Sequence, residues 1–511
     1  MQGPDATPYP LDHLACRGAH DSIALVTKAE SISFSTLDAM TGRLAHALIA
    51  SGLCAGDRVA TWLNKTVDAC IMPLAAARAG LVHVPINPVL KRGQVTHILA
   101  DSGAKALITG AGRAQSLENG DLPTDCVLWP EERAAAARAN GTALPPSNCN
   151  PNDLAAILYT SGSTGQPKGV MLSHANLWLG AVSVAHYLKI TPDDRVLALL
   201  PLSFDYGQNQ LLSTWAAGAT AVPLDYMTAR DVVKAVDRYA ITSLAGVPPL
   251  WVQLIEADWP AVTAGSLMRL TNSGGALTPT LVRKLRTLFP TADLFPMYGL
   301  TEAFRSTYLD PALVDRHPTS IGSAIPFAEV MVVRSDGYQA EPGETGELVH
   351  AGPLVAHGYW QDTDRTALRF KPAPDWSAYG GMAVWSGDTV RRDEGGILYF
   401  VGRDDEMIKT SGNRVSPGEI EEVAIASGYA VEAVALGIKD ERLGQSIVLI
   451  IRARDQSGDV TDALMEHFRR ESPSFLQPKT IQVWKDLPRN ANGKLDRAGI
   501  RTQFLNMGNT L

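Results

Sequence analysis

A loop rich in glycine and hydroxyl residues, placed directly after an apolar run, is the feature that most restricts the possible folds of this chain. The apolar run is Leu154 to Leu158, and the loop from Tyr159 to Gly169 contains three glycines, four Ser or Thr residues and Lys168. Such a run, bounded by turn residues, predicts a buried strand. The loop offers backbone N–H groups, hydroxyls and a cation to a polyphosphate, although it lacks the Gly-Lys-Ser/Thr ending of the usual P-loop. Taken alone, it is also compatible with an ordinary surface loop.

Length and composition indicate a multidomain globular protein. At 511 residues the chain is too long for one ordinary core. Hydrophobic residues make up 45% and charged residues 19%, which is typical of folded proteins. The net charge is −8 with both signs spread along the chain, so we expect no nucleic-acid partner, which would require a basic stripe.

The termini and cysteines favour a cytoplasmic location. Met1 to Pro10 has no basic segment followed by an apolar one, so we expect no secretory signal. No apolar run reaches the roughly 18–20 residues of a membrane helix, so we expect no membrane insertion. The cysteines of the chain are Cys16, Cys54, Cys70, Cys126 and Cys149. They are scattered and form no CxxC pair, which argues against disulfides and against a zinc site.

Alternating helical and strand patterns in the first 330 residues predict a mostly parallel α/β sheet. Leu37, Met40, Leu44 and Leu48 recur at helical spacing, with Ser35 or Thr36 as the expected cap. Further on, Ala229 to Tyr239 is another helical stretch. The expected strands are Val59–Leu63, Leu81–Ile86, Ala106–Thr109, Val196–Leu200, Ala219–Leu224 and Leu244–Val247. Helix-length segments separate them, which indicates βαβ units. The stretch Ala134 to Asn152 is expected to be a surface connection.

The pattern changes beyond residue 330. The short alternating runs are Val330–Val333, Gly346–His350 and Ile397–Val401. Because Asp-Gly, Pro-Gly and Gly-Gly separate them, they predict a β-rich subdomain at about residues 330–400. The charged, glycine-containing stretch from Gly402 to Pro417 then marks a candidate domain boundary. Mixed α/β character follows to the end of the chain.

Four further motifs accompany the loop. In Met297-Tyr298-Gly299-Leu300-Thr301-Glu302, an aromatic ring, a hydroxyl and a carboxylate follow in order, and one carboxylate plus phosphates suffices for Mg²⁺. The others are Trp385-Ser386-Gly387-Asp388, the segment Gly402 to Glu421, and the segment Pro488 to Arg497 with Asn492-Gly493-Lys494. Each of them alone is compatible with a simple turn.

Together and in this order, the five motifs resemble the adenylate-forming enzymes, which include acyl-CoA synthetases, amino-acid adenylation domains and luciferases. The resemblance covers residues 159 to 497 and implies an α/β fold. It implies a large N-terminal domain of parallel-type α/β sheets with a β-rich subdomain (residues 1–402) and a small, mobile C-terminal α+β lid (residues 403–511), with the hinge at Asp405. The sequence is also similar to stand-alone ligases of bacterial exosortase-associated gene clusters.

The resemblance also implies roles for single residues. Lys494 would be the catalytic lysine, acting with Thr301 and Glu302, and Glu302 would hold Mg²⁺. Gly274-Gly275-Ala276 would contact the adenine, and Asp388 and Arg403 the ribose. The implied ATP-binding residues are Thr160, Ser161, Gly162, Ser163, Thr164, Gly165, Lys168, Gly274, Gly275, Ala276, Tyr298, Gly299, Thr301, Asp388 and Arg403. At Glu406 the family more often has an aspartate.

The implied reaction is ATP-dependent ligation. A carboxylate attacks the α-phosphorus of ATP, pyrophosphate leaves, and a thiol then displaces AMP from the acyl adenylate to form a thioester. The protein contributes positioning and fixed positive charge from Lys494, Mg²⁺ and loop amides. Loss of one such charge would cost on the order of 3–4 kcal/mol in the barrier, by analogy with an oxyanion-hole donor.

The pocket motif Leu200 to Gly207 favours an amino acid as the substrate. Most acyl-CoA synthetases have an aromatic residue followed by histidine there, whereas this chain has Phe204-Asp205, which resembles amino-acid adenylation domains, where the aspartate pairs with the substrate ammonium. Arg305 suits a substrate carboxylate or phosphate, but Asp205 could instead pair with Arg305. The implied pocket is polar: Phe204, Asp205, Tyr206, Asn209, Thr271, Ser273, Met297, Arg305 and Ser306.

The acceptor thiol is left open. No carrier domain is expected within the sequence, so the phosphopantetheine thiol would come from a separate acyl or peptidyl carrier protein or from CoA. The main alternative is an acyl-CoA synthetase acting on a polar or non-amino acid. An adenylate-forming enzyme with an oxygen or amine acceptor is also open. A silent binding protein is disfavoured, because Lys494, Glu302 and the loop are all present.

Overall fold

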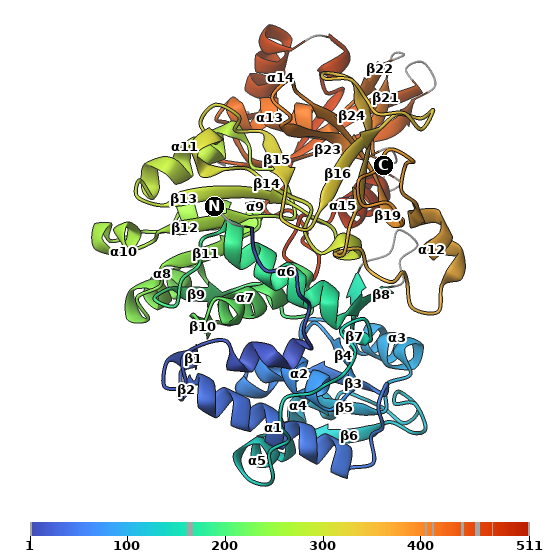
Figure 1. The fold of residues 1–511 in the computed structure, drawn as a ribbon. Helices are drawn as coiled ribbons and strands as arrows, with labels where there is room; N and C mark the ends of the chain where they lie inside the picture. Colours follow the sequence, from blue (N-terminus) through green and yellow to red (C-terminus); the bar gives the residue numbers. More distant parts are fainter. Residues whose placement is uncertain are drawn as a thin grey trace.

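The structure, a computed structural model, describes residues 3–160, 167–403, 406–410, 413–440, 444–454, 460–472 and 474–508. In Figure 1 the chain passes from an N-terminal sheet (blue) through a central sheet (green and yellow) to a C-terminal sheet (orange to red). The mixed α/β architecture agrees with the fold class expected from the sequence. Within these described residues, no helix is both long and apolar enough to span a bilayer.

The N-terminal sheet is parallel except at one edge, as the alternating pattern predicts. Its strands lie in the order β6 (Val127–Pro130), β5 (Ala106–Thr109), β3 (Arg58–Trp62), β4 (Val82–Pro85), β7 (Leu154–Thr160) and β8 (Lys168–Ser173). Only β8 runs antiparallel to its neighbour, β7. This antiparallel pair brings Lys168 opposite Thr160 across the phosphate loop. The sheet's helices are α1 (Phe34–Ala50), α2 (Val67–Arg78), α3 (Arg92–Ser102), α4 (Ala111–Ala114) and α5 (Glu131–Ala139).

Helix α1 begins earlier than expected. Its N-cap is Ser33, whose hydroxyl accepts a hydrogen bond from the backbone N–H of Thr36, so the expected cap at Ser35 or Thr36 is wrong. The reason is burial of Phe34, which is 2% exposed and occupies the first helical position. A serine with extended backbone just before it therefore satisfies a free N–H of the first turn.

The central sheet joins a parallel half to an antiparallel half in 14 strands. The parallel half contains β1 (Ile23–Val26), β10 (Thr220–Pro223), β9 (Arg195–Ala198), β11 (Ser243–Gly246), β12 (Arg269–Asn272) and β13 (Asp293–Tyr298), with β2 (Ser31–Ser33) antiparallel at the edge of β1. The antiparallel half contains β14 (Thr307–Tyr308), β15 (Ser320–Ala324), β20 (Leu398–Arg403), β19 (Met382–Arg392), β17 (Thr345–Ala351), β16 (Glu329–Val333) and β18 (Phe370–Pro372). The β-rich region is thus hydrogen-bonded onto the parallel strands.

One large core joins the N-terminal sheet and the central sheet. It includes Val59 and Ile108 of the N-terminal sheet, Leu197 and Leu270 of the central sheet, and Leu211 on α7 (Asp205–Ala216). Helices associated with the central sheet are α6 (His174–Tyr187), α7 (Asp205–Ala216), α8 (Ala229–Arg238), α9 (Pro248–Ile255), α10 (Ala261–Gly265), α11 (Pro279–Leu288) and α12 (Thr363–Arg369), with short turns η1 (Leu11–Cys16), η2 (Thr301–Ala303) and η3 (Pro311–Leu313).

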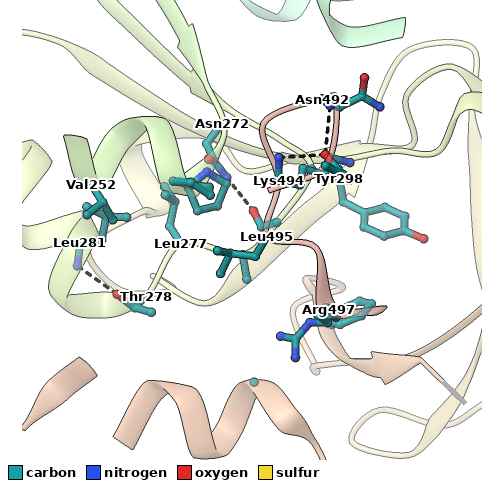
Figure 2. Close-up of a pocket in the computed structure, with 18 of the residues that line it drawn as sticks. Val252, Asn272, Leu277, Thr278, Leu281, Tyr298, Asn492, Lys494, Leu495 and Arg497 are labelled. Atoms are coloured by element: carbon teal, nitrogen blue, oxygen red, sulfur yellow. Dashed lines mark hydrogen bonds between the residues drawn. The ribbon is translucent and has the colours of Figure 1, made fainter. Parts of the chain in front are cut away.

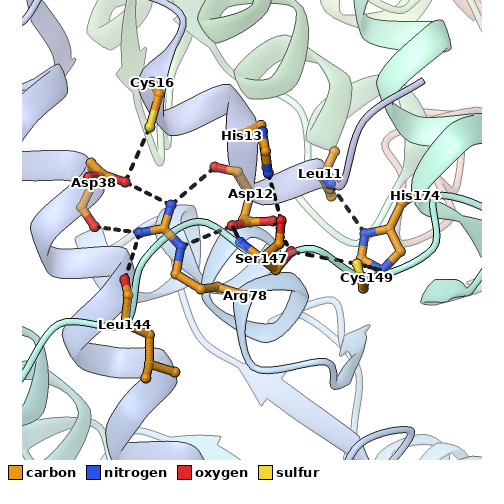
Figure 3. A network of polar contacts seen from close by, with 10 residues as sticks. All are labelled: Leu11, Asp12, His13, Cys16, Asp38, Arg78, Leu144, Ser147, Cys149 and His174. Carbon is orange, nitrogen blue, oxygen red and sulfur yellow. Dashed lines mark hydrogen bonds and ion pairs between the residues drawn. The ribbon is translucent and has the colours of Figure 1, made fainter. Parts of the chain in front are cut away.

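A buried ionic network fixes the chain's first helical turn to this core (Figure 3). Arg78 on α2 pairs with Asp12 at 3.0 Å and with Asp38 at 2.7 Å, and its side chain is 1% exposed. Ser147 donates to Asp12 through its backbone N–H and its hydroxyl. The expected surface connection Ala134–Asn152 is therefore only partly correct, because it begins inside α5 and then packs against this network.

The C-terminal sheet is mixed, as expected for an α+β lid. Its strands are β22 (Asn413–Val415), β21 (Ile408–Thr410), β24 (Gly444–Ala453) and β23 (Ala430–Asp440), with β25 (Thr480–Val483) parallel to β24. Helices α13 (Pro417–Ala426), α14 (Val460–Glu471) and α15 (Arg497–Gly508) and the turn η4 (Ser474–Leu476) complete it. Its separate core includes Ile420, Leu449 and Phe468. The expected hinge, Asp405, lies outside the described residues.

Candidate active site

A cavity of about 2550 Å³ lies between the central sheet and the C-terminal sheet. Gly274, Gly275 and Ala276, which follow β12, line it together with Tyr298 at the end of β13 and Lys494 from the C-terminal part. Figure 2 shows the loop of Asn492 to Leu495 close to the segment that carries Asn272 and Leu277. In open parallel sheets, ligands bind at the carboxyl ends of the strands, so this is the expected place for a substrate.

The described part of the phosphate loop carries one hydroxyl without a partner among the described residues and one cation. Thr160 ends β7, and its buried Oγ1 has no hydrogen-bond partner within the described residues. Lys168 begins β8 and donates from Nζ to Glu302 Oε1 at 3.1 Å and to the Tyr359 hydroxyl at 2.7 Å. The loop residues between them, Ser161, Gly162, Ser163, Thr164 and Gly165, lie outside the described residues.

Glu302 is held as a carboxylate at the cavity wall. Its Oε1 accepts hydrogen bonds from Lys168 and from Tyr359, the latter at 2.7 Å. Burial acts to raise its pKa, but Lys168 and the Tyr359 hydroxyl outweigh this, so the pKa of Glu302 is lowered. Among the described residues no group of three or more His, Cys, Asp or Glu could hold a metal ion. A single ionised carboxylate beside a phosphate site fits Mg²⁺, which takes its other ligands from phosphates and water.

Tyr359 is a site residue that the sequence analysis missed. Its ring lies under the Lys168 ammonium, 4.1 Å from Nζ to the ring centre. It reaches the site through an isolated antiparallel bridge to Val170 on β8. Nothing in the sequence around Tyr359 signals this pairing, because its partner is on a strand far away in the chain.

Asp388 connects two of the motifs. The Tyr298 hydroxyl donates to Asp388 Oδ2 at 2.5 Å, and Arg403 Nε donates to Asp388 Oδ1 at 2.7 Å. The register of β19 and β20 places Asp388 and Arg403 directly opposite each other. The ring of Phe400 lies 6.3 Å from that of Tyr298, so the two rings form an aromatic wall beside this carboxylate.

Lys494 projects from a tight turn toward the cavity. Asn490 Oδ1 accepts from the Lys494 backbone N–H at 3.1 Å, and the Asn490 N–H donates back to the Lys494 carbonyl at 2.8 Å. Gly493 has a φ of +78°, which glycine adopts without strain. The turn therefore fixes the backbone of Lys494.

The Lys494 side chain is seated against the N-terminal part. Its Nζ lies 4.7 Å from the centre of the Phe204 ring. A Cβ on Gly274 would lie 2.4 Å from the Lys494 Cε, so the missing side chain at Gly274 makes room for the lysine. Burial lowers the pKa of Lys494, and the nearby charges of Arg305 and Arg403 lower it further, against the opposing effect of Asp205.

Asp205 begins α7 as a buried carboxylate. It is 6% exposed and accepts a hydrogen bond from the Thr301 hydroxyl at 3.2 Å. Arg305 Nη2 lies 4.0 Å from its Oδ2. Burial raises the pKa of Asp205, although Arg305 and Lys494 oppose this. Asp205 therefore has charged neighbours but only a long ion pair, and a bound ammonium would stabilise its ionised form.

Arg305 is anchored deep in the same wall. It is 2% exposed, donates to Ser273 Oγ at 2.7 Å and lies over the Tyr206 ring at 4.6 Å. The Tyr206 hydroxyl is hydrogen-bonded to Thr271 at 2.6 Å. Gly299 permits this arrangement, since a Cβ there would lie 2.9 Å from the Arg305 Cα.

Most of the expected acid-pocket residues surround a small second cavity of about 30 Å³: Tyr206, Asn209, Thr271, Met297 and Arg305. Asn209 Oδ1 and Arg305 Nε are buried there without a partner in the described part of the chain. Phe204 and Thr301 line the large cavity instead, Met297 lines both cavities, and Asp205 and Ser273 line neither. Ser306 is turned away, because its hydroxyl is hydrogen-bonded to His350 at 2.9 Å.

Comparisons with known proteins agree with this geometry. The AMP-binding enzyme family matches residues 13–360, and the AMP-binding enzyme C-terminal domain matches residues 419–494. The crystal structure of ATP-bound MatB from Rhodopseudomonas palustris is 26% identical and has a TM-score of 0.88, covering 98% of this chain and 99% of that one.

Two curated relatives differ in the acceptor that their names state. L-proline--[L-prolyl-carrier protein] ligase of Pseudomonas fluorescens is 29% identical, covering 94% of this chain and 96% of its own length. 3-[(3aS,4S,7aS)-7a-methyl-1,5-dioxo-octahydro-1H-inden-4-yl]propanoyl:CoA ligase of Mycobacterium tuberculosis is 30% identical, covering 97% and 98%. The chain spans only 14% of a much longer relative, Surfactin synthase subunit 1 of Bacillus subtilis, to which it is 29% identical.

Proposed function

The chain belongs to the AMP-binding enzyme family and is an AMP-forming acid–thiol ligase, and we propose that its acid is an amino acid and its acceptor the phosphopantetheine thiol of a separate carrier protein. The buried carboxylate of Asp205 is the observation that carries the proposal for the acid. It lies beside Thr301 and within the field of Lys494, where a substrate ammonium would provide the countercharge that a buried carboxylate needs.

The first half-reaction joins the acid to AMP. The substrate carboxylate attacks the α-phosphorus of ATP, the bond to the β-phosphate oxygen breaks, and pyrophosphate leaves with the electron pair. Lys494 places its ammonium next to the developing negative charge, and Lys168 and the loop amides hold the phosphates. Glu302 would hold Mg²⁺, which supplies further positive charge to the phosphates when bound. Asp388 and Arg403 would hold the ribose, and the segment Gly274 to Ala276 the adenine.

The second half-reaction forms the thioester. The thiol sulfur attacks the acyl carbon, the bond to the phosphate oxygen breaks, and AMP leaves. Residues 403–511 would act as a lid that turns about Asp405 between the two steps, because Lys494 occupies the cavity in this structure and must withdraw before a thiol can enter.

Arg305 would make the pocket selective. Its Nε and the Asn209 Oδ1 have no partner among the described residues, and both residues line a cavity of about 30 Å³, so the best substrates would have a short side chain with a polar group. The proposal that the acceptor is a carrier protein is supported by the similarity to a prolyl-carrier protein ligase over nearly the full length of both chains.

A second candidate function, ligation of an acid without an amine, follows from the distance between Asp205 and Arg305. At 4.0 Å these charges partly neutralise each other, which would leave a polar pocket for an acid without an amine. In that case CoA would be the acceptor, as in the CoA ligase relative.

An assay of AMP release separates these functions. The enzyme is incubated with MgATP and each of a panel of amino, dicarboxylic, aryl and fatty acids, alone, with CoA, or with a phosphopantetheinylated carrier protein. We expect AMP release with an amino acid that is accelerated by the carrier protein. Acceleration by CoA with a non-amino acid would support the second candidate, and equal release without any thiol would refute both acceptors.

A further inference from the structure

We propose that Asn87 is a positioning residue that holds the turn of Lys494 against the N-terminal part during adenylation. Asn87 lies just beyond β4, at the carboxyl end of that strand, and is 4% exposed. Its Nδ2 donates to the backbone carbonyl of Ala491 at 2.7 Å, across 404 residues of sequence. The inference rests on the proposed role of Lys494 in the first half-reaction.

The orientation of the Asn87 amide is set by its own neighbourhood. Its Oδ1 accepts a hydrogen bond from the Val89 backbone N–H at 3.1 Å, which leaves Nδ2 as the group that points toward the turn. The same Nδ2 lies 3.5 Å from Asn492 Oδ1. An amide is thus required here, because one end must accept and the other must donate.

Holding Ala491 also places Lys494. Ala491 and Lys494 belong to one turn that two hydrogen bonds close. The Lys494 backbone N–H donates to Asn490 Oδ1 at 3.1 Å, and the Asn490 N–H donates to the Lys494 carbonyl at 2.8 Å. A displacement of Ala491 would therefore carry the Lys494 ammonium away from Phe204 and Gly274. A shift of about 1 Å at a reacting group is enough to lower a rate by roughly a hundredfold.

A second polar contact between the same two parts, among the described residues, is weaker. Arg452 on β24 lies 3.7 Å from Glu256, with side chains 21% and 48% exposed. An ion pair that is this long and this open to water contributes little and is screened by salt. The buried hydrogen bond of Asn87 is short and specific to one backbone carbonyl, so it is better suited to fix the position of the turn.

The variant Asn87→Asp distinguishes a role in holding the Lys494 turn from a role confined to the turn that contains Asn87. Asn87→Asp keeps an oxygen that accepts from Val89 N–H, but it replaces the donor facing Ala491 with a second acceptor. If Asn87 only shaped its own turn, the aspartate variant would resemble the wild type and Asn87→Ala would be worse. If the donor matters, Asn87→Asp is the worse of the two, because two oxygens then face each other.

Lysine labelling tests the position of Lys494 without knowledge of the acid. The whole enzyme with MgATP is acetylated briefly with a water-soluble reagent, and the modification of Lys494 is measured relative to the exposed Lys485 by peptide mass spectrometry. We expect relative labelling of Lys494 to rise about tenfold or more in Asn87→Asp, the order of effect of one lost buried hydrogen bond. Asn64→Asp, just beyond neighbouring β3 and hydrogen-bonded by Arg113, is the control.

The half-reactions give the second readout. With an acid identified by its exchange activity, Asn87→Asp should slow ATP–pyrophosphate exchange about tenfold or more, while transfer from a preformed acyl adenylate to the thiol stays within about twofold of wild type. Unchanged Lys494 labelling in a variant with wild-type melting temperature would overturn the inference, as would equal slowing of both half-reactions. If the wild type itself shows no exchange with any acid, the proposed function fails, yet the labelling still decides whether Asn87 positions Lys494.

Discussion

The ammonium group of Lys494 lies 4.7 Å from the centre of the Phe204 ring, although the two residues are far apart in the chain, one just before α7 and the other in a turn of the C-terminal part. Phe204 precedes Asp205, the candidate anchor for the acid, and Lys494 belongs to the turn held by Asn87. The proposed catalytic charge and the proposed acid pocket therefore lie next to each other, as the proposed adenylation step requires.

Removal of the Lys494 charge should nearly abolish adenylation. We expect Lys494→Ala to lower the rate of ATP–pyrophosphate exchange by a factor equivalent to about 3–4 kcal/mol, with MgATP binding largely retained. Lys485→Ala, which removes an exposed lysine of the same domain, is the control. Exchange at the wild-type rate in Lys494→Ala would contradict the assignment.

The pH dependence of adenylation should show the lowered pKa of Lys494. Burial lowers this pKa below the usual lysine value, and the reaction needs the protonated ammonium. The rate should therefore fall as pH rises through a value below the ordinary lysine range. Lys494→Arg, whose guanidinium stays protonated, should retain some activity and lose this alkaline decline. An identical alkaline decline in both enzymes would assign it to another group.

A side chain at Gly274 should displace Lys494 without altering the C-terminal part. A Cβ there would lie 2.4 Å from the Lys494 Cε, and the backbone φ of +79° is itself unfavourable for alanine. Gly274→Ala should slow adenylation by at least about tenfold. The control is Gly265→Ala, a position where an added Cβ meets nothing within 4 Å. Similar losses in both variants would show that the effect is not local.

Loss of the Tyr359 hydroxyl should weaken the use of Mg²⁺. Tyr359→Phe keeps the ring beneath Lys168 but removes the hydrogen bond to Glu302 Oε1. The pKa of Glu302 should rise, since this hydroxyl helps to lower it. We expect the Mg²⁺ concentration for half-maximal exchange to rise by about threefold to tenfold. An unchanged Mg²⁺ requirement would argue against Glu302 as the metal ligand.

Local patterns in the sequence predict the elements well. The strand Ala106–Thr109 has the expected bounds, and the helix expected at Ala229–Tyr239 is α8, one residue shorter. These elements follow from alternation, helical spacing and turn residues, which act over short distances. The motifs also identify Lys168, Tyr298, Glu302, Asp388 and Lys494 as a group, and the structure brings these residues to one cavity.

Long-range partners are not visible in the sequence. Tyr359 meets Glu302 across 57 residues and Asn87 meets Ala491 across 404, and neither contact leaves a local pattern. The cap of α1 was misplaced because burial of Phe34, a tertiary effect, determines where that helix begins. The acid pocket is also less open than its residues suggest, since Asp205 is buried and is not among the residues that line the large cavity.

The most direct test of an amino-acid substrate is ATP–pyrophosphate exchange by wild type and Asp205→Ala across the acid panel. Removal of the carboxylate leaves a substrate ammonium unpaired, so we expect exchange with an amino acid in the wild type and its loss by at least about a hundredfold in Asp205→Ala. Asp68→Ala, which removes a buried carboxylate that lines neither cavity, should retain exchange. Exchange confined to acids without an amine, or amino-acid exchange that survives in Asp205→Ala, would contradict the account.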